Sequence, residues 1–188
     1  SRTLMKTLAE HLAAEPFELV LSSGFFGFFA HTGVVLALEE AGLTPTQLGG
    51  SSAGALVAGL WGAGLPATVL RDTLLGLSRS AFWDVDPLWG LPFYLRRGKL
   101  RDIAQRLGIG RLADESSGPG LLRGQAFDYI LRGLLSQVSV ETFDDCAIPV
   151  RLAAFALDTL QTEVLDEGDL TLAIRASCCF PGMFQPVK

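Results

Sequence analysis

Gly50–Gly54 reads Gly-Ser-Ser-Ala-Gly, which places Ser52 in the pattern Gly-x-Ser-x-Gly. Small residues around a serine permit a sharp strand-to-helix turn that exposes the hydroxyl as a nucleophile. The unpaired N–H groups at the start of the helix would also favour the negative charge of an acyl-transfer intermediate. The pattern is short, however, and a serine before small residues also serves as an ordinary helix N-cap. The residues predicted to form the turn around this candidate nucleophile are Gly50, Ser51, Ala53 and Gly54.

A second glycine-rich turn, Ser22–Phe29, follows the apolar run Phe17–Leu21. Its backbone N–H groups could face an oxyanion, which is the electrostatic help that acyl transfer needs most. The alternatives are a plain tight turn and the phosphate loop of a dinucleotide-binding domain, but the glycine pattern and acidic residue of such a loop are incomplete here. The four phenylalanines of the turn suit acyl chains better than a pyrophosphate. The predicted oxyanion donors are Gly24, Phe25, Phe26, Gly27 and Ala53.

Each of these turns is expected to lie between a strand and a helix. Apolar runs predict strands at 17–21 and 48–50, and apolar residues at helical spacing predict helices at 30–41 and 53–60. The alternation indicates an α/β fold with a mostly parallel sheet. The other predicted elements are a leading helix at about 1–15, helices at 65–77, 98–107 and 125–135, a strand at 149–157 and its hairpin partner at 162–165.

The composition indicates one globular domain over residues 1–188, because 49% of the residues are apolar and only 19% are charged. A net charge of −5 argues against a nucleic-acid partner, whose phosphates attract clustered Lys and Arg. The short basic cluster Arg96–Arg101 is interpreted as a solvated helix start, with a phosphate or anionic-lipid contact as the alternative. The aromatic stretch 82–94 is interpreted as core packing, with a lid or a membrane contact as the alternative.

The cysteines Cys146, Cys178 and Cys179 have neither the spacing of metal ligands nor the even number of a disulfide framework. A reducing compartment is therefore expected, and Cys178 and Cys179 are interpreted as small core residues. The leading segment lacks the apolar core of a signal peptide, and no run approaches the ~18 apolar residues of a membrane span. We expect a cytoplasmic protein, soluble or peripherally attached to a membrane, that uses no metal and no organic cofactor.

Three segments, Leu19–Gly24, Ala30–Val34 and Gly50–Ala55, resemble the patatin-like phospholipase family in order and spacing. Further landmarks that resemble the family are Arg96–Arg101, Thr142–Asp145, Ile148–Val150, Ala173–Ser177 and Phe180–Pro186. The resemblance extends over about residues 19–187. It implies a three-layer fold with helices on both faces of a mostly parallel sheet. It also implies a lipid acyl hydrolase of the phospholipase A, lysophospholipase or esterase type, with a lipid or other acyl ester as substrate.

The family uses a Ser-Asp dyad, which fits the scarcity of histidine in this chain. A Ser-His-Asp triad needs a histidine beside the nucleophile, and the two histidines, His11 and His31, are interpreted as surface or structural residues. In a dyad the aspartate takes the serine proton itself or assists a water to do so. The oxyanion loop departs from the family, because relatives carry three glycines and a basic residue where this chain reads Ser23–Phe28. Backbone donors do not depend on side chains, so the hole can survive, whereas substrate anchoring is left open.

The aspartate is the second departure. In relatives it belongs to an Asp-Gly-Gly or Asp-Gly-Ala motif beyond the Phe180–Pro186 landmark, and no such motif occurs up to Lys188. Asp158 and Asp169 do not match it, and Asp169 is expected to cap a helix. We therefore expect the base beyond residue 188 of a longer protein, with a truncated, inactive relative as the alternative. The other functions left open are a non-catalytic lipid-binding or regulatory protein and a nucleotide-binding domain built on the Gly24 turn.

Overall fold

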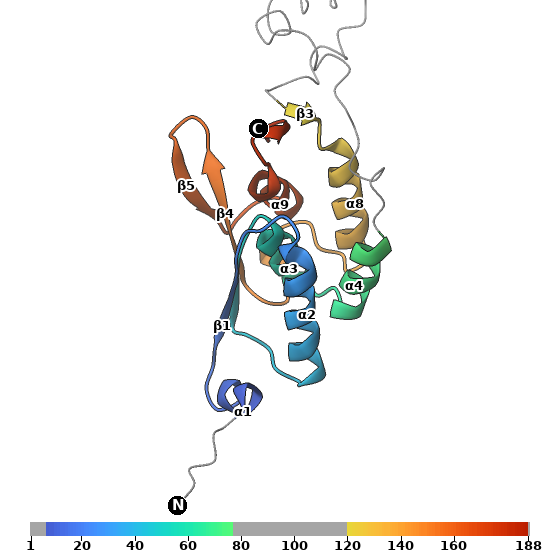
Figure 1. Cartoon of the computed structure of the whole chain (residues 1–188), viewed down its shortest axis with the longest axis vertical. Coiled ribbons are helices and arrows are strands. Elements are labelled where there is room, and N and C mark those ends of the chain that lie inside the picture. The colour runs from blue at the N-terminus through green and yellow to red at the C-terminus, as the bar shows by residue number, and fades with distance from the viewer. Residues whose placement is uncertain (1–6, 77–119, 188) are drawn as a thin grey trace, which may run out of the picture. The chain divides into compact units, whose positions relative to one another are not determined.

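The computed structural model describes residues 7–76 and 120–187 of the chain (Figure 1). These residues belong to two compact units. The first unit contains residues 7–76 and 132–178, and the second contains residues 120–131 and 179–187. The candidate nucleophile, Ser52, lies in the first unit.

A four-stranded sheet forms the centre of the first unit. Its strands follow the order β1-β2-β4-β5 and are β1 (Glu18–Leu21), β2 (Gln47–Ser51), β4 (Val150–Ala156) and β5 (Gln161–Leu165). The first three run parallel, and β5 returns antiparallel to β4 as a hairpin. Because parallel strands end at the same edge of a sheet, the segments that follow β1, β2 and β4 begin on one side. This carboxyl edge is where the two glycine-rich turns meet.

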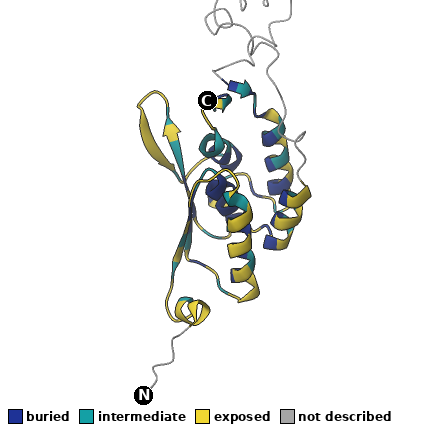
Figure 2. Cartoon of the chain, in the orientation of Figure 1, coloured by how far each residue is buried: buried dark blue, intermediate teal, exposed yellow. Residues whose placement is uncertain are grey.

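Helix α3 (Ala53–Gly62) lies at the heart of the first unit, and every one of its residues is buried, as the dark blue of Figure 2 shows. Its small residues permit this close packing. A Cβ atom at Gly59 would stand 2.6 Å from Ile174 Cδ1 of helix α9 (Leu170–Cys178), and one at Gly62 would collide with Val150 of β4. The glycines therefore let α3 approach both its neighbouring helix and the sheet.

Two further helices complete this packing, α2 (Gly27–Glu40) and α4 (Ala67–Gly76). Glu39 of α2 joins them to α3, because its carboxylate accepts hydrogen bonds from Trp61 Nε1 at 2.7 Å and from the Ala67 N–H at 3.0 Å. The short helix α1 (Leu8–Leu12) precedes β1 and begins with a capping box between Thr7 and Glu10. The three-helix contact around Glu39 holds α3 from the side away from the sheet.

The two faces of the sheet differ in what covers them. Leu21, Leu48 and Leu152 point toward α3 and α9 and are buried, whereas the alternate residues Val20 and Arg151 face the other side and are exposed. The α/β class and the mostly parallel sheet with its helices are confirmed. Within residues 7–76 and 120–187, the helices that contact the sheet lie on one face. A helical layer on the second face is not among these residues.

The second unit contains a small parallel sheet of β3 (Gly120–Leu122) and β6 (Gly182–Phe184). The Gln185 N–H donates to the Leu122 carbonyl at 2.9 Å, and a Cβ atom at Gly120 would stand 2.5 Å from Gln185 N. The first turns of helix α8 (Gln125–Ser136) place the Phe127 ring 6.4 Å from the Phe184 ring. The landmark Phe180–Pro186 thus supplies one strand of this sheet.

The predicted strands and helices agree closely with the structure wherever it describes them. Two boundaries are wrong. The leading helix ends at Leu12 rather than at about residue 15, and α2 begins at Gly27 rather than at Ala30, so Phe28 and Phe29 belong to the helix. The N-cap residue Phe26 forms no side-chain capping bond, which explains why no start signal is visible in the sequence. The predicted helix at 98–107, the basic cluster Arg96–Arg101 and the aromatic stretch 82–94 lie outside the described residues.

Candidate active site

Ser52 connects the last residue of β2 to the first residue of α3 and has a strained backbone, with φ 52° and ψ −116°. A positive φ is uncommon for a residue other than glycine and costs about 1–3 kcal/mol when the surrounding structure enforces it. Ser52 occupies the N-cap position of α3, yet its hydroxyl forms no capping hydrogen bond. The structure therefore contradicts the ordinary N-cap interpretation of this half-buried serine, whose hydroxyl has no capping partner.

The two glycines of the pattern are required by close contacts on either side of Ser52. A Cβ atom at Gly50 would stand 2.5 Å from the Gly54 carbonyl oxygen and 2.7 Å from Ala55 N. A Cβ atom at Gly54 would collide with the Leu21 carbonyl of β1 and lie 2.8 Å from the Ser22 carbonyl oxygen. We call residues Gly50–Gly54 the elbow, since the start of α3 is pressed against β1 and β2 there.

The end of α9 holds the elbow from a third direction. The Ser52 N–H donates to Ser177 Oγ at 2.8 Å, and the Ser177 hydroxyl donates to the Ala153 carbonyl of β4 at 2.6 Å. The Cys178 thiol donates to the Ser52 carbonyl at 3.2 Å. Ser177 and Cys178 therefore tie both backbone polar groups of Ser52 to α9, and Ser177 ties them further to β4. Sequence reasoning included Ser177 in a family landmark but missed this role.

The turn after β1 lies beside the elbow. A Cβ atom at Gly27 would be 3.7 Å from Ala53 Cβ, so the start of α2 and the start of α3 are neighbours. The Gly27 N–H donates to the Gly24 carbonyl at 2.7 Å and closes the turn. Within the described part of the chain, the N–H groups of Phe25 and Phe26 form no hydrogen bond. Of the predicted oxyanion donors, Gly24, Phe25, Phe26 and the first helical residue Ala53 have N–H groups without a hydrogen-bond partner among the described residues, whereas the Gly27 N–H closes the turn.

His31 holds this turn from within α2. Its Nε2 atom lies 2.8 Å from the Ser22 carbonyl oxygen, to which it donates when Nε2 carries the proton. The same nitrogen would lie 3.1 Å from a Cβ atom at Gly27, so Gly27 also makes room for the histidine ring. His31 thus fixes the segment between β1 and the predicted oxyanion donors.

The three cysteines are not in disulfides in the structure, and each contacts a different part of the chain. Cys178 contacts the elbow, Cys179 Sγ donates to the Gln185 carbonyl at 3.3 Å, and Cys146 Sγ donates to the Thr142 carbonyl at 3.8 Å. Burial, with a smaller contribution from the Asp145 charge, raises the pKa of the Cys146 thiol to about 11. Within the described residues, no group of three or more His, Cys, Asp or Glu side chains could hold a metal ion.

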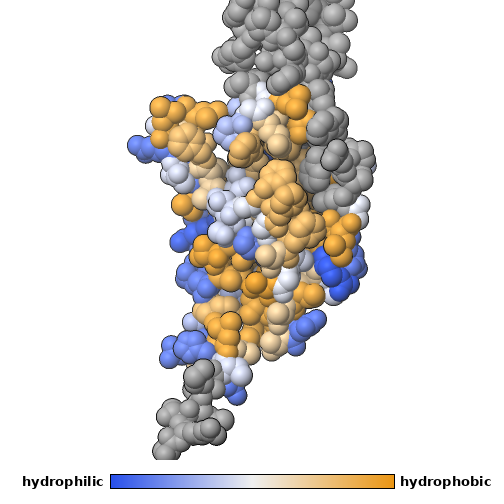
Figure 3. Space-filling model, viewed as in Figure 1, coloured by the Kyte–Doolittle hydropathy of each residue, from blue (hydrophilic) through white to orange (hydrophobic). Residues whose placement is uncertain are grey.

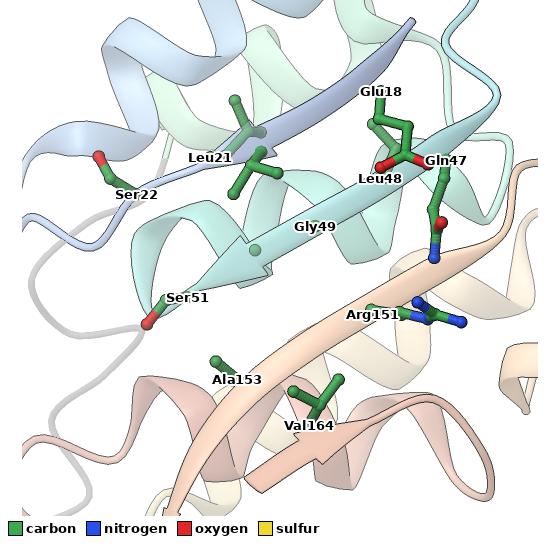
Figure 4. Close-up of a pocket in the computed structure, with 12 residues that line it drawn as sticks. Glu18, Leu21, Ser22, Gln47, Leu48, Gly49, Ser51, Arg151, Ala153 and Val164 are labelled. Atoms are coloured by element: carbon green, nitrogen blue, oxygen red, sulfur yellow. The ribbon is translucent and has the colours of Figure 1, made fainter. Parts of the chain in front are cut away.

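A cavity of about 380 Å³ lies on the uncovered face of the sheet and ends at the elbow. Figure 4 shows Ser22 and Ser51 at one end of its lining, and Glu18 and Gln47 at the other. Gly49 and Ala153 form its floor and leave it shallow. The cavity therefore leads along the strands to the residue that precedes Ser52.

The profile of the family described as patatin-like phospholipase matches residues 19–188. This chain belongs to the patatin-like phospholipase family. An uncharacterized NTE family protein of Mycobacterium tuberculosis is 31% identical over 171 residues, which cover 89% of this chain and 38% of that protein. A protein of Emericella nidulans named lysophospholipase nte1 is 27% identical over 181 residues, covering 96% of this chain and 10% of that protein. The chain thus spans well under half the length of these patatin-like relatives.

Solved structures support the same fold. ExoU of Pseudomonas aeruginosa, crystallised with SpcU, has a TM-score of 0.58 and 19% identity, covering 88% of this chain and 38% of that chain. VipD of Legionella pneumophila has a TM-score of 0.54 and 16% identity, covering 90% of this chain and 43% of that chain. At these identities the likeness shows the fold alone.

Asp158 and Asp169 have other partners than Ser52 in the structure. Asp169 accepts a hydrogen bond from the Leu172 N–H at 2.9 Å and pairs with Arg132 at 2.9 Å, which confirms that it caps α9. Asp158 accepts from the Thr159 N–H at 2.8 Å in the turn of the β4–β5 hairpin. No carboxylate in residues 7–76 and 120–187 forms a hydrogen bond with the Ser52 hydroxyl. The dyad therefore stays a prediction.

Proposed function

We propose that this protein is a serine-dependent lipid acyl-ester hydrolase whose nucleophile is Ser52. The observation that carries the proposal is the backbone of Ser52, which is strained, held on three sides and free of the capping bond that would otherwise explain the residue. Strain that the surrounding structure enforces is typical of functional residues. A strand–Ser–helix turn between two sterically required glycines is the arrangement that exposes a serine nucleophile.

The proposed chemistry follows from the groups around the elbow. Ser52 Oγ attacks the ester carbonyl while its proton passes to an aspartate that we place outside the described residues. The N–H of Ala53, at the positive end of α3, and those of Phe25 and Phe26 stabilise the negative oxygen of the tetrahedral intermediate. The tetrahedral intermediate collapses, the ester C–O bond breaks, and the leaving oxygen takes the proton from the aspartate and departs as an alcohol. A water that gives its proton to the same aspartate then attacks the acyl-serine, which releases the fatty acid and returns the proton to Ser52 Oγ.

The proposed substrate is a lipid ester of the phospholipid or lysophospholipid kind. Family membership supports it, as does the relative from Emericella nidulans that is named a lysophospholipase. The side chains around the predicted oxyanion donors fit the same class, because Phe25 and Phe26 are apolar and exposed.

A fluorophosphonate probe tests the proposal on the full-length protein that contains these residues. We expect the probe to modify the wild-type protein and Ser51→Ala, and to leave Ser52→Ala unmodified. Ser51 is the matched control because it is the adjacent serine and is equally half-buried. Equal labelling of Ser52→Ala and wild type, or no labelling of either, would contradict a serine nucleophile at this position.

A non-catalytic lipid-binding protein is the second candidate. The observation that favours it is that no carboxylate of the described residues forms a hydrogen bond with the Ser52 hydroxyl. This candidate predicts that the full-length protein binds lipid vesicles but is neither labelled by the probe nor able to release fatty acid. Release of fatty acid that disappears in Ser52→Ala excludes it.

A further inference from the structure

Four strongly exposed apolar side chains lie at the carboxyl edge of the sheet. Phe25 and Phe26, in the turn after β1, are 67% and 70% exposed. Leu157 and Leu160, in the turn between β4 and β5, are 58% and 71% exposed. We call these four residues the apolar rim. Apolar side chains that gather without protein cover mark surfaces for a partner more often than isolated ones do.

The two parts of the apolar rim follow the strands on either side of the one that leads into the candidate nucleophile. The strand order places β2, which leads into Ser52, between β1 and β4. Neighbouring strands are about 4.8 Å apart, so the end of β1 lies about one strand spacing from the elbow. Ser51 pairs with Ala153, and β4 continues to Ala156, so the hairpin turn begins about 10 Å farther along the strand direction than the elbow. In Figure 1 the β4–β5 hairpin projects beyond the helices, and Figure 3 shows its tip in the orange of hydrophobic residues.

The backbone of Leu160 is a second indication that this tip has an external partner. Its φ is 56°, a region that suits glycine or asparagine and is costly for leucine. Packing within the described residues does not account for the leucine, because 71% of it is exposed. A leucine at this position presents an apolar side chain outward where a polar residue would fit the turn better.

The charge around the rim indicates the chemistry of the partner. Segments 22–29 and 155–162 contain no Lys or Arg and one acidic residue, Asp158. Anionic membranes attract clusters of basic residues, and the rim has none to offer. Burial of Phe and Leu side chains is favourable at any lipid surface, whatever its charge. Because the rim segments lack basic residues and contain Asp158, they fit a lipid surface without net charge better than an anionic one.

We propose that the apolar rim inserts into the interface of a zwitterionic lipid surface and thereby brings Ser52 to the ester bonds of its lipids. The proposal rests on the lipid hydrolase function proposed above and names the docking surface for it. Phe25 and Phe26 also supply predicted oxyanion donors through their backbone N–H groups, so the inserting side chains and these donors belong to the same turn. The hairpin residues serve insertion alone.

Binding is tested apart from catalysis with vesicles of ether-linked phosphatidylcholine, which have no ester to hydrolyse. We expect the full-length protein to co-sediment with these vesicles. The double variant Leu157→Ser/Leu160→Asn should lower the partition coefficient by at least about tenfold, because burial of one such side chain contributes roughly that factor. Replacing part of the phosphatidylcholine by phosphatidylserine should leave binding unchanged or weaker. The matched control is Leu8→Ser on α1, which is 73% exposed and precedes the opposite end of β1, and it should bind like wild type.

The stability of Leu160→Asn separates docking from a structural role. Asparagine tolerates the positive φ, so this variant should melt no lower than wild type while its vesicle binding falls. A lower melting temperature with unchanged binding would show that other parts of the protein cover the rim. Rim-dependent self-association without vesicle binding would identify a protein partner instead. Either result overturns the proposal.

The failure of docking and the failure of the hydrolase function are distinguishable. Hydrolysis of a soluble, short-chain ester reports the chemistry alone, and the hairpin variants should retain it while losing activity on phosphatidylcholine vesicles. Normal activity of these variants on vesicles would overturn the docking proposal and leave the hydrolase intact. Wild-type protein that binds the vesicles but is not labelled by the probe would overturn the hydrolase function and leave the docking proposal intact.

Discussion

The elbow and the β4–β5 hairpin tip each contain a residue other than glycine with a positive φ, Ser52 at 52° and Leu160 at 56°. Their surroundings are opposite. Ser52 is enclosed by β1, β2, α3 and α9, and both of its backbone polar groups are hydrogen-bonded to α9. The tight hairpin turn enforces the positive φ of Leu160, and this residue is mostly exposed. The comparison teaches that the same backbone cost has two uses: strain enforced by surrounding helices and strands holds an atom in place, and strain in an exposed turn presents a side chain outward.

The tightest contact of the elbow gives the largest expected effect. Gly54→Ala would drive a methyl group into the Leu21 carbonyl, whose strand cannot easily move. We expect a loss of about 3 kcal/mol in the free energy of unfolding, measured by urea denaturation. Gly33→Ala in α2 is the matched control, because a Cβ atom there meets nothing within 4 Å, and it should gain about 0.5–1 kcal/mol. A tolerated Gly54→Ala would mean that the elbow is no more constrained than the hairpin.

Removal of the Ser177 hydroxyl should give the next largest effect. Ser177→Ala leaves the Ser52 N–H without its acceptor and the Ala153 carbonyl without its donor, at a cost of about 1–3 kcal/mol. We also expect fluorophosphonate labelling of the folded full-length protein to slow by about tenfold, since a misplaced nucleophile loses orientation. Both losses are measured on the same samples.

Two variants of equal shape separate positioning from packing at this residue. Ser177→Thr retains the hydroxyl and should restore most of the labelling rate, whereas Ser177→Val should not. Ser136→Ala removes a serine hydroxyl that bonds locally to Gly133 in α8, and it should label normally. Equal labelling rates for Thr and Val would show that Ser177 only fills space.

Release of the strain itself should give the smallest change in stability and the sharpest contrast in function. Glycine adopts positive φ freely, so Ser52→Gly and Leu160→Gly each relieve backbone strain, but each also adds conformational entropy to the unfolded chain. We expect a net gain of about 0.5–1 kcal/mol in the free energy of unfolding for each variant. Ser52→Gly should lose all labelling, whereas Leu160→Gly should label like wild type. Thermal denaturation and probe labelling measure the two effects. No gain in Ser52→Gly would show that the elbow is not strained in solution.

Much of the fold was accessible from the sequence, because its signals are local. The apolar runs before both glycine turns are strands, and the small-residue run after Ser52 is a helix. The start of α2 was missed because its first turn contains phenylalanines and no capping side chain. Asp169 was correctly predicted as a helix cap, since Gly-Asp-Leu before an apolar run is a local pattern as well.

The supports of the candidate site were not accessible in the same way. Ser177 is 125 positions from Ser52 along the chain, and only the crossing of α9 over β4 brings the two together. The Gly24–Gly27 turn shows the same limit. Its sequence suggested four donors, and the fold uses one of them, the Gly27 N–H, to close the turn.

The sequence by itself determined the elbow pattern, the strand–turn–helix units around it and the membership of the patatin-like phospholipase family, because each depends on residue types at short, regular spacing. The tertiary structure decided that the Ser52 hydroxyl does not cap α3, that Ser177 and Cys178 hold its backbone, and that exposed apolar side chains follow the two strands next to β2. These features depend on strands and helices that meet in space from distant parts of the chain. No local pattern encodes such a meeting.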